Sequence, residues 1–257
     1  MELRLKFNED AANYDKARPS YPAELFQDIF EYSKIGKSSS LLEIGIGTGQ
    51  ATLPFLELGC NITAVELGSD LAEYSKVKFA SYENLNIINA DFIEADLKSG
   101  CYDMIYCATA FHWLPQEEAY NKIKKLLKPG GTLALFWNHP FPNRADDEVN
   151  MASRQVYDKY RATDKPLTEF SEKDLKKRKA ELEQNGFEDV EARLYKRTRR
   201  LSSREYISLI NTYSDHRALP DDIRQAFEEE MLCAVDALGG KINIYDTIDL
   251  YLAKNKK

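Results

Sequence analysis

The stretch Leu41–Gln50, LLEIGIGTGQ, decides how the rest of this chain folds. A short apolar segment with one acid is followed by glycines at three alternate positions, Gly45, Gly47 and Gly49. Glycine is favoured where the backbone turns at positive φ or where a ligand approaches it closely. The pattern therefore predicts a first strand that ends in a tight loop, a helix behind the loop, and a nucleotide-type cradle at the carboxyl end of the strand.

The spacing of the glycines narrows the choice of nucleotide. The dinucleotide fingerprint is G-x-G-x-x-G, whereas this loop reads G-x-G-x-G and is one residue tighter. Glu43, two residues before the first glycine, would also repel a pyrophosphate seated at a helix N-terminus. An acid there suits a ligand that carries positive charge, such as an ammonium group beside a sulfonium. Both features disfavour an NAD-type oxidoreductase.

Strand-like and helix-like segments alternate along the chain from this point. We expect strands at 41–44, 62–65, 85–88, 103–107, 132–137, 187–201 and 241–253. We expect helices at 22–36, 50–58, from Ser69, from Pro115, and at 146–161, 171–185, 202–213 and 221–238. Five apolar strands separated by helices predict an α/β fold with a parallel, doubly wound sheet covered on both faces.

Composition limits the classes of function. The chain has 257 residues, of which 43% are hydrophobic and 30% charged, as in soluble globular proteins. The net charge of −7 argues against a nucleic-acid or anionic-membrane partner. The N-terminus lacks the apolar core of a signal peptide, and no apolar segment approaches the length of a membrane span. Its four cysteines have no metal-ligand spacing, so we expect no metal and a cytoplasmic location.

Acids follow the second and third expected strands. Glu66 can accept hydrogen bonds from both hydroxyls of a ribose bound over the first strand; the alternative is an exposed acid at a strand end. Asp91 can accept an adenine amine while Phe92 covers the ring, unless the two are a turn aspartate and a core phenylalanine. Ala108, after the fourth strand, is small enough to line a ligand with backbone.

Taken in order, these segments resemble the motifs of class I S-adenosylmethionine (SAM)-dependent methyltransferases, across residues 38–137. The segments are Leu41–Gln50, Glu66, Asn89–Phe92, Tyr102–Trp113 and Leu127–Gly131. Within that superfamily the chain is similar to the small-molecule group that includes trans-aconitate methyltransferases. The Tyr14…Arg18-Pro19…Tyr21-Pro22 pattern and the Phe111-His112-Trp113 segment carry this second resemblance.

The resemblance implies a fold, a cofactor and a set of binding residues. The fold is a Rossmann-like, seven-stranded sheet whose last strand is antiparallel and lies beside the fifth. The cofactor is S-adenosyl-L-methionine, with Tyr14 and Arg18 closing over its methionine end and Arg18 near its carboxylate. The implied cofactor-binding residues are Tyr14, Arg18, Glu43, Gly45, Gly47, Gly49, Glu66, Leu67, Asp91, Phe92 and Ala108.

The predicted layout is a single methyltransferase domain, 1–257, built around this cofactor core at 38–137. An N-terminal arm and helix occupy 1–37. Helical insertions at 138–186 and 202–240 form a lid over the acceptor, and strands at 187–201 and 241–253 form a C-terminal pair.

The implied reaction is a direct SN2-type displacement of a methyl group from a sulfonium by a small-molecule acceptor (EC 2.1.1.-). Alignment and exclusion of water supply much of its rate, and a base is needed only for a protonated acceptor. His112 is the candidate for acceptor positioning or proton removal; the alternative is an imidazole packed between Phe111 and Trp113. Further candidates for the acceptor pocket are Trp113, His139, Tyr213 and His216.

Other functions stay open at this stage. A basic segment, Arg193–Arg204, would meet an anionic substrate or RNA, but such segments more often are solvated edge strands. A non-enzymatic SAM-binding protein with a blocked acceptor site fits the same motifs. The sequence does not identify the acceptor, the methylated atom, the pathway or the oligomeric state.

Overall fold

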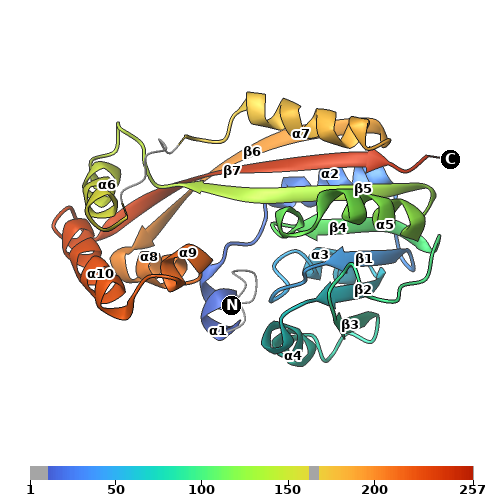
Figure 1. Cartoon of the computed structure of the whole chain (residues 1–257), viewed down its shortest axis with the longest axis horizontal. Helices are drawn as coiled ribbons and strands as arrows, with labels where there is room; N and C mark the ends of the chain where they lie inside the picture. Colours follow the sequence, from blue (N-terminus) through green and yellow to red (C-terminus); the bar gives the residue numbers. More distant parts are fainter. Residues whose placement is uncertain (1–10, 162–167, 257) are drawn as a thin grey trace. The chain divides into compact units, whose positions relative to one another are not determined.

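Seven strands form one sheet in the order β3-β2-β1-β4-β5-β7-β6 (Figure 1). They are β1 (Ser40–Ile44), β2 (Asn61–Glu66), β3 (Leu85–Asn89), β4 (Tyr102–Ala108), β5 (Leu127–Phe141), β6 (Glu188–Ser202) and β7 (Lys241–Lys254). The pairs β1–β2, β2–β3, β1–β4 and β4–β5 are parallel. The last strand is antiparallel, and its final residues meet the start of β5, where Gly130 N–H donates to Asn255 O and Asn255 N–H donates to Gly131 O. The predicted α/β fold with an antiparallel last strand is confirmed.

This computed structural model describes residues 11–161 and 168–256. Residues 1–10 of the predicted arm and 162–167 of the first predicted insertion therefore lie outside the described residues. The helices are α1 (Ala11–Ala17), α2 (Ala23–Ser33), α3 (Leu53–Glu57), α4 (Ser69–Lys78), the 3₁₀ helix η2 (Phe111–Trp113), α5 (Gln116–Leu126), α6 (Glu148–Tyr160), α7 (Glu172–Gln184), α8 (Ser203–Ile210), α9 (Ser214–Arg217) and α10 (Asp221–Asp236). None of these described helices is both long and apolar enough to cross a bilayer.

The chain divides into two compact units, and three strands contribute to both. Unit 1 comprises residues 1–18, 139–170 and 196–247, and unit 2 comprises residues 19–138, 171–195 and 248–257. Unit 1 holds helices α1, α6, α8, α9 and α10, whereas unit 2 holds the others. The layout of a single domain with a cofactor core, two insertions and a strand pair stays a prediction.

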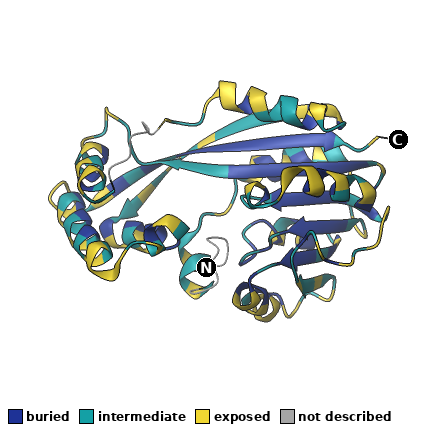
Figure 2. Ribbon diagram, viewed as in Figure 1, coloured by how far each residue is buried: buried dark blue, intermediate teal, exposed yellow. Residues whose placement is uncertain are grey.

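Unit 2 is built on strands β1, β2, β4 and β5, most of whose residues are buried, whereas β3 is only partly buried and the outer helix faces are exposed (Figure 2). On one face of the sheet, Phe26 of α2 and Phe55 of α3 pack with Tyr106 and Phe136 in a single apolar cluster. Alternate residues of the same strands point to the opposite face, which α5 and α7 cover. There the Arg178 guanidinium of α7 lies 3.8 Å from the Trp137 ring. Helices thus cover both faces, as a buried parallel sheet requires.

Unit 1 has its own core, formed by helices and the outer ends of strands. Phe227, Met231 and Val235 of α10 share one helix face and pack with Val156 of α6 and Ile242 of β7. The i+4 spacing of the α10 residues was the sequence signal for this apolar face.

Several element boundaries differ from the sequence expectation. Strand β5 starts earlier than the strand expected at 132–137, because Leu127 pairs with Tyr102 of β4 and residues 130–131 exchange hydrogen bonds with Asn255, just after β7. The helix expected at 202–213 ends at Ile210, where the Thr212 hydroxyl donates to Leu209 O at 2.6 Å, and α9 starts afresh at Ser214. Helix α4, by contrast, starts at Ser69 as expected, with Gly68 at its N-cap.

Candidate functional site

The glycine loop follows β1 with three residues in the left-handed region of backbone space. The φ angles are +74° at Gly45, +58° at Gly47 and +81° at Gly49. A Cβ on Gly45 would lie 2.9 Å from the Ala110 Cβ, and one on Gly49 would lie 2.2 Å from the Phe79 ring. Glycine is therefore required by conformation at all three positions and by close packing at the outer two.

Glu66, at the end of β2, ties this loop to the start of α4. Its Oε2 accepts a hydrogen bond from Gly47 N–H at 2.9 Å, and its Oε1 accepts one from Gly68 N–H at 2.9 Å. The side chain is only 7% exposed, and this burial raises the pKa of the carboxyl, while the bonds from Gly68 and Gly47 oppose the rise. A carboxylate offers about four lone-pair directions, so two bonds leave acceptor capacity for ligand hydroxyls.

Glu43 lies within β1 and points into the protein. Its Oε2 accepts hydrogen bonds from Thr52 Oγ1 and from Tyr106 OH, both at 2.8 Å, and the residue is 1% exposed. Burial raises the pKa of this carboxyl to about 8. The group is therefore mostly neutral at pH 7, so charge attraction to a cationic ligand does not explain its place in the motif.

The strand-end residues of β2 and β3 are linked by an amide. Asn89 Nδ2 donates to Glu66 O at 2.9 Å and to Leu67 O at 3.1 Å. After β3, the Asp91 Oδ1 accepts a hydrogen bond from Ile93 N–H at 2.8 Å, which tightens the turn. The Phe92 ring is 4% exposed, so its side chain supports the loop from the interior.

The end of β4 contains a strained residue that the sequence did not reveal. Thr109, directly after the half-buried Ala108, has φ +55°, an unusual value for a β-branched residue. Its N–H donates to Phe136 O at 2.8 Å, and its Oγ1 shares a hydrogen bond of 2.6 Å with the Tyr21 hydroxyl. Such strain clusters at functional sites, and this one lies beside the glycine loop through Ala110.

His112 lies in η2, two residues beyond Ala110. Trp137 Nε1 donates a hydrogen bond to His112 Nδ1 at 3.2 Å, and the Trp113 ring lies 4.9 Å from the imidazole. Because an indole N–H only donates, Nδ1 must be the accepting nitrogen, and a neutral His112 carries its proton on Nε2. The side chain is exposed rather than packed in the core.

Trp137 is itself held from several directions. Its backbone N–H donates to Asp249 Oδ1 at 3.1 Å, and Tyr251 OH donates to Asp249 Oδ2 at 2.8 Å. The Arg178 guanidinium stacks on the indole. The orientation of His112 is thus set by a fixed ring.

Unit 1 contains the remaining predicted residues. Arg18 Nε donates to Thr212 Oγ1 at 2.8 Å, its NH2 group donates to Thr212 O at 2.9 Å, and its guanidinium lies over the Tyr14 and Tyr213 rings. Their predicted roles toward cofactor and acceptor stay predictions.

The two other histidines, both in unit 1, occupy different environments. His139 stacks on Phe170, with ring centroids 4.0 Å apart. His216 is 2% exposed, its Nε2 shares a hydrogen bond of 3.2 Å with Tyr157 OH, and it contacts Phe227. Burial lowers the pKa of His216 to about 4, so this imidazole is neutral at pH 7.

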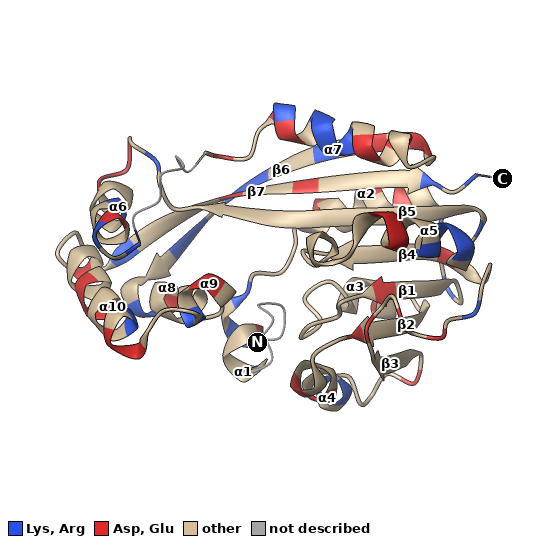
Figure 3. Ribbon diagram, viewed as in Figure 1, with Lys and Arg blue, Asp and Glu red and all other residues tan. Residues whose placement is uncertain are grey.

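The basic segment runs along β6, at the edge of the sheet (Figure 3). Within unit 2, Arg193 forms ion pairs with Asp28 and Glu191. Within unit 1, Arg197 and Arg199 both hold the buried Asp246, at 3.0 and 2.6 Å. Acids of the same unit thus neutralise part of the segment. Among residues 11–161 and 168–256, no three His, Cys, Asp or Glu side chains gather as a metal ligand set would.

Comparison with known proteins adds sequence and fold relatives. Residues 42–135 match the family model described as a methyltransferase domain. An uncharacterized methyltransferase of Schizosaccharomyces pombe is 28% identical over 88% of this chain and 85% of that protein. A probable S-adenosylmethionine-dependent methyltransferase of Saccharomyces cerevisiae is 30% identical, over 55% of this chain and 50% of that protein.

Solved structures share the fold at low sequence identity. A putative type II methyltransferase from Anaeromyxobacter dehalogenans matches with a TM-score of 0.67 at 19% identity, over 93% of this chain and 98% of that chain. Haemonchus contortus phosphoethanolamine N-methyltransferase 2, solved with S-adenosyl-L-methionine, matches with a TM-score of 0.59 at 12% identity. That match covers all of this chain but only 60% of the Haemonchus chain.

Proposed function

Because the chain belongs to the class I SAM-dependent methyltransferases, we propose that its methyl acceptor is a small molecule. The observation that carries the proposal is the ion pairing of the basic strand β6. Asp28 and Glu191 pair with Arg193, and Asp246 with Arg197 and Arg199. A polyanion site would need such cations for phosphates. The net charge of −7 also argues against a polyanionic acceptor.

The residues around the glycine loop fit S-adenosylmethionine. Glu66 retains lone pairs for ribose hydroxyls beside the Gly47 backbone, and the positive φ angles of the loop let backbone approach a ligand. We assign Asp91 to the adenine amine, and Leu67 and Ala108 to the walls. Glu43 accepts a hydrogen bond from Thr52, which follows the loop, so we assign it an indirect contribution to cofactor binding.

Some assignments stay predictions with no further support from the described contacts. They are the Phe92 ring over the adenine, Tyr14 and Arg18 at the methionine end, and Trp113, His139, Tyr213 and His216 in the acceptor pocket. The cytoplasmic location of the protein likewise stays a prediction, as does its membership of the trans-aconitate methyltransferase-like group.

The bound cofactor supplies a methyl group on a positively charged sulfur, which an acceptor lone pair displaces directly. What the chain supplies is alignment and exclusion of water. Of the two roles expected for His112, the geometry favours positioning. With Nδ1 accepting from Trp137, the neutral ring presents Nε2–H, a donor, and removal of a substrate proton would require the Trp137 bond to break.

The test is formation of S-adenosylhomocysteine with panels of small carboxylates, amines, phenols and thiols. Turnover on at least one class, reduced in Glu66→Ala when the cofactor is below saturation, is the expected result. If the protein binds the cofactor but no class of acceptor reacts, the result would favour a non-enzymatic SAM-binding protein. Steeply salt-dependent binding to RNA would instead favour a macromolecular acceptor.

A further inference from the structure

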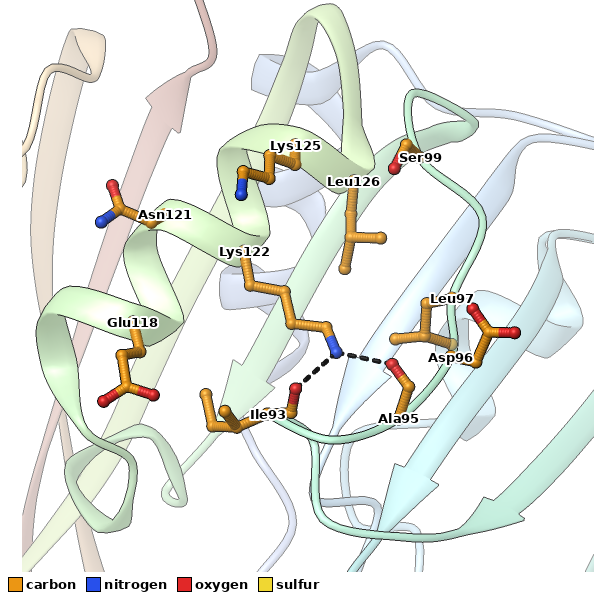
Figure 4. A pocket seen from close by; sticks show the side chains of 10 residues that line it. All are labelled: Ile93, Ala95, Asp96, Leu97, Ser99, Glu118, Asn121, Lys122, Lys125 and Leu126. Carbon is orange, nitrogen blue, oxygen red and sulfur yellow. Dashed lines mark hydrogen bonds between the residues drawn. The ribbon is translucent and has the colours of Figure 1, made fainter.

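The segment after β3, residues 90–99, contains the proposed adenine contact, Asp91, and its residues 93–99 lie across a pocket from helix α5 (Figure 4). Its first turn is closed by Asp91, whose Oδ1 accepts from Ile93 N–H and whose carbonyl accepts from Ala95 N–H at 2.8 Å. These bonds shape the turn internally. They do not fix where the turn lies relative to the rest of unit 2.

One side chain of α5 reaches the turn. Lys122 Nζ donates to Ile93 O at 2.8 Å and to Ala95 O at 2.6 Å, as Figure 4 shows. The same ammonium lies 5.4 Å from the centre of the Phe92 ring, within the range of a cation–π contact. One cation therefore touches three of the five residues from Asp91 to Ala95.

The Phe92 ring and Ala95 are buried, but the space between the segment and α5 is open. An open pocket of about 470 Å³ lies between the segment and α5, lined from one side by Leu97 and Ser99 and from the other by Asn121 and Lys125. Close packing would otherwise fix a loop against a helix. Across this gap, among the described residues, the lysine makes the side-chain hydrogen bonds that join the turn to α5.

We propose that Lys122 is a positioning residue for the cofactor: it holds the 91–95 turn on α5 so that Asp91 stays at the adenine amine. The proposal rests on the assignment of Asp91 to adenine. Charge-assisted hydrogen bonds to two carbonyls are the stronger kind, and their geometry requires an extended cation of this length. Lys122 acts through Asp91 and does not itself touch the ligand.

The contact also depends on protonation. Burial lowers the pKa of Lys122, and the carboxylates of Glu94, Asp91 and Asp96 oppose the shift. From α5, Glu118 and Lys125 line the same pocket. As the pH rises through this lowered pKa, the ammonium loses its charge and the turn is held less tightly. Affinity for adenosine-containing ligands should then fall.

The test compares Lys122→Met, Lys122→Arg and Lys125→Met. The methionine keeps the length of the side chain but removes the cation, whereas Lys125 lines the same pocket one turn away and has no side-chain hydrogen bond among those found in the described residues. We expect K122M to weaken S-adenosylhomocysteine and 5′-methylthioadenosine binding by a common factor of about ten, the worth of one charged hydrogen bond. The value of kcat at saturating cofactor should change little, and K122R and K125M should stay near wild type.

A pH series separates positioning from a merely structural role. As the pH rises through the lowered pKa of Lys122, 5′-methylthioadenosine affinity should fall in the wild type and stay level in K122R, whose guanidinium stays charged over this range. Equal binding by K122M and wild type would overturn the proposal while leaving the methyltransferase function intact. A loss for S-adenosylhomocysteine alone would overturn it too, since the turn would not then serve the adenine. If K122M does not fold, a level wild-type pH series decides against the proposal. A wild type that binds neither ligand would overturn the proposed function instead.

Discussion

Glu43 and Glu66 are buried carboxylates on neighbouring strands, and their partners give them different roles. Glu66 binds two backbone N–H groups at the strand end, where a ligand can reach it. Glu43 binds two hydroxyls inside the sheet layer. Single substitutions should therefore separate a binding effect from a stability effect.

Replacing Glu66 with alanine should weaken S-adenosylhomocysteine binding by about 1–3 kcal/mol, because two ribose hydroxyls lose their acceptor. Isothermal titration calorimetry measures the loss. Glu73→Ala, at an exposed position on α4, is the matched control. Glu66→Gln keeps one acceptor oxygen and is a second variant in case the loop collapses in Glu66→Ala. Unchanged affinity in Glu66→Ala would mean that the ribose assignment is wrong.

Replacing Glu43 with glutamine should leave stability at pH 5 within about 1 kcal/mol, because a neutral acid and an amide offer the same acceptor. Since burial raises the folded pKa to about 8, above the ordinary glutamate value of 4.5, the wild type binds more protons folded than unfolded between these values. Its unfolding free energy relative to E43Q should thus fall by up to about 1.4 kcal/mol per pH unit as pH rises through this window. Urea unfolding of both proteins at several pH values checks this; parallel curves would refute the buried, neutral carboxyl.

The sequence predicts these acids as a pair of motif residues, because strand ends and glycines are local signals. It does not predict their partners. Tyr106, which binds Glu43, lies 63 residues away in the chain, and Trp137, which binds His112, lies 25 residues away. Such contacts arise from strand order and register. The positive φ of Thr109 has no sequence signal at all.

At the scale of elements, the β1–α3 loop is limited by both conformation and packing. Gly49→Ala should destabilise the protein by about 2–4 kcal/mol, since its Cβ would overlap the Phe79 ring in addition to the cost of positive φ. Gly186→Ala is the control, because φ there is +85° but no atom lies within 4 Å of the added Cβ. We expect it to cost only about 1 kcal/mol. Urea unfolding that gives equal losses would show that the packing contact is unimportant.

Elements with one buried face were predictable from local pattern, whereas elements defined by distant partners were not. Strand β5 begins at Leu127 and runs through a Lys-Pro-Gly-Gly segment that is typical of a helix stop, where its partners are the distant Tyr102 of β4 and Asn255, just after β7. The break between α8 and α9 falls at residues 211–213, where the Thr212 hydroxyl and N–H both donate to Leu209 O. Capping boxes at Ser171 and Ser202, by contrast, follow from residues three apart and are present.

At the scale of the whole molecule, the buried His216 should make the unfolding free energy decrease as the pH is lowered. Its folded pKa of about 4 lies below the ordinary histidine value of 6.5, so between these pH values the unfolded chain binds a proton that the folded chain does not. Unfolding free energy should fall by up to about 1.4 kcal/mol per pH unit until about pH 4. Circular dichroism during urea unfolding measures it. His216→Gln should flatten this part of the profile, and His139→Gln should not; equal slopes in all three proteins would refute it.

The order of the strands has a consequence for how the chain is made. Strand β7 is last in the sequence, yet it stands between β5 and β6 in the sheet. While the ribosome is still adding residues 241–254, β6 has no neighbour and β5 has an open edge, so the nascent chain exposes unpaired strand edges until β7 has been made. A premature stop codon before β7 would therefore remove an interior strand of the sheet, and chaperones would have to protect the chain until β7 has emerged.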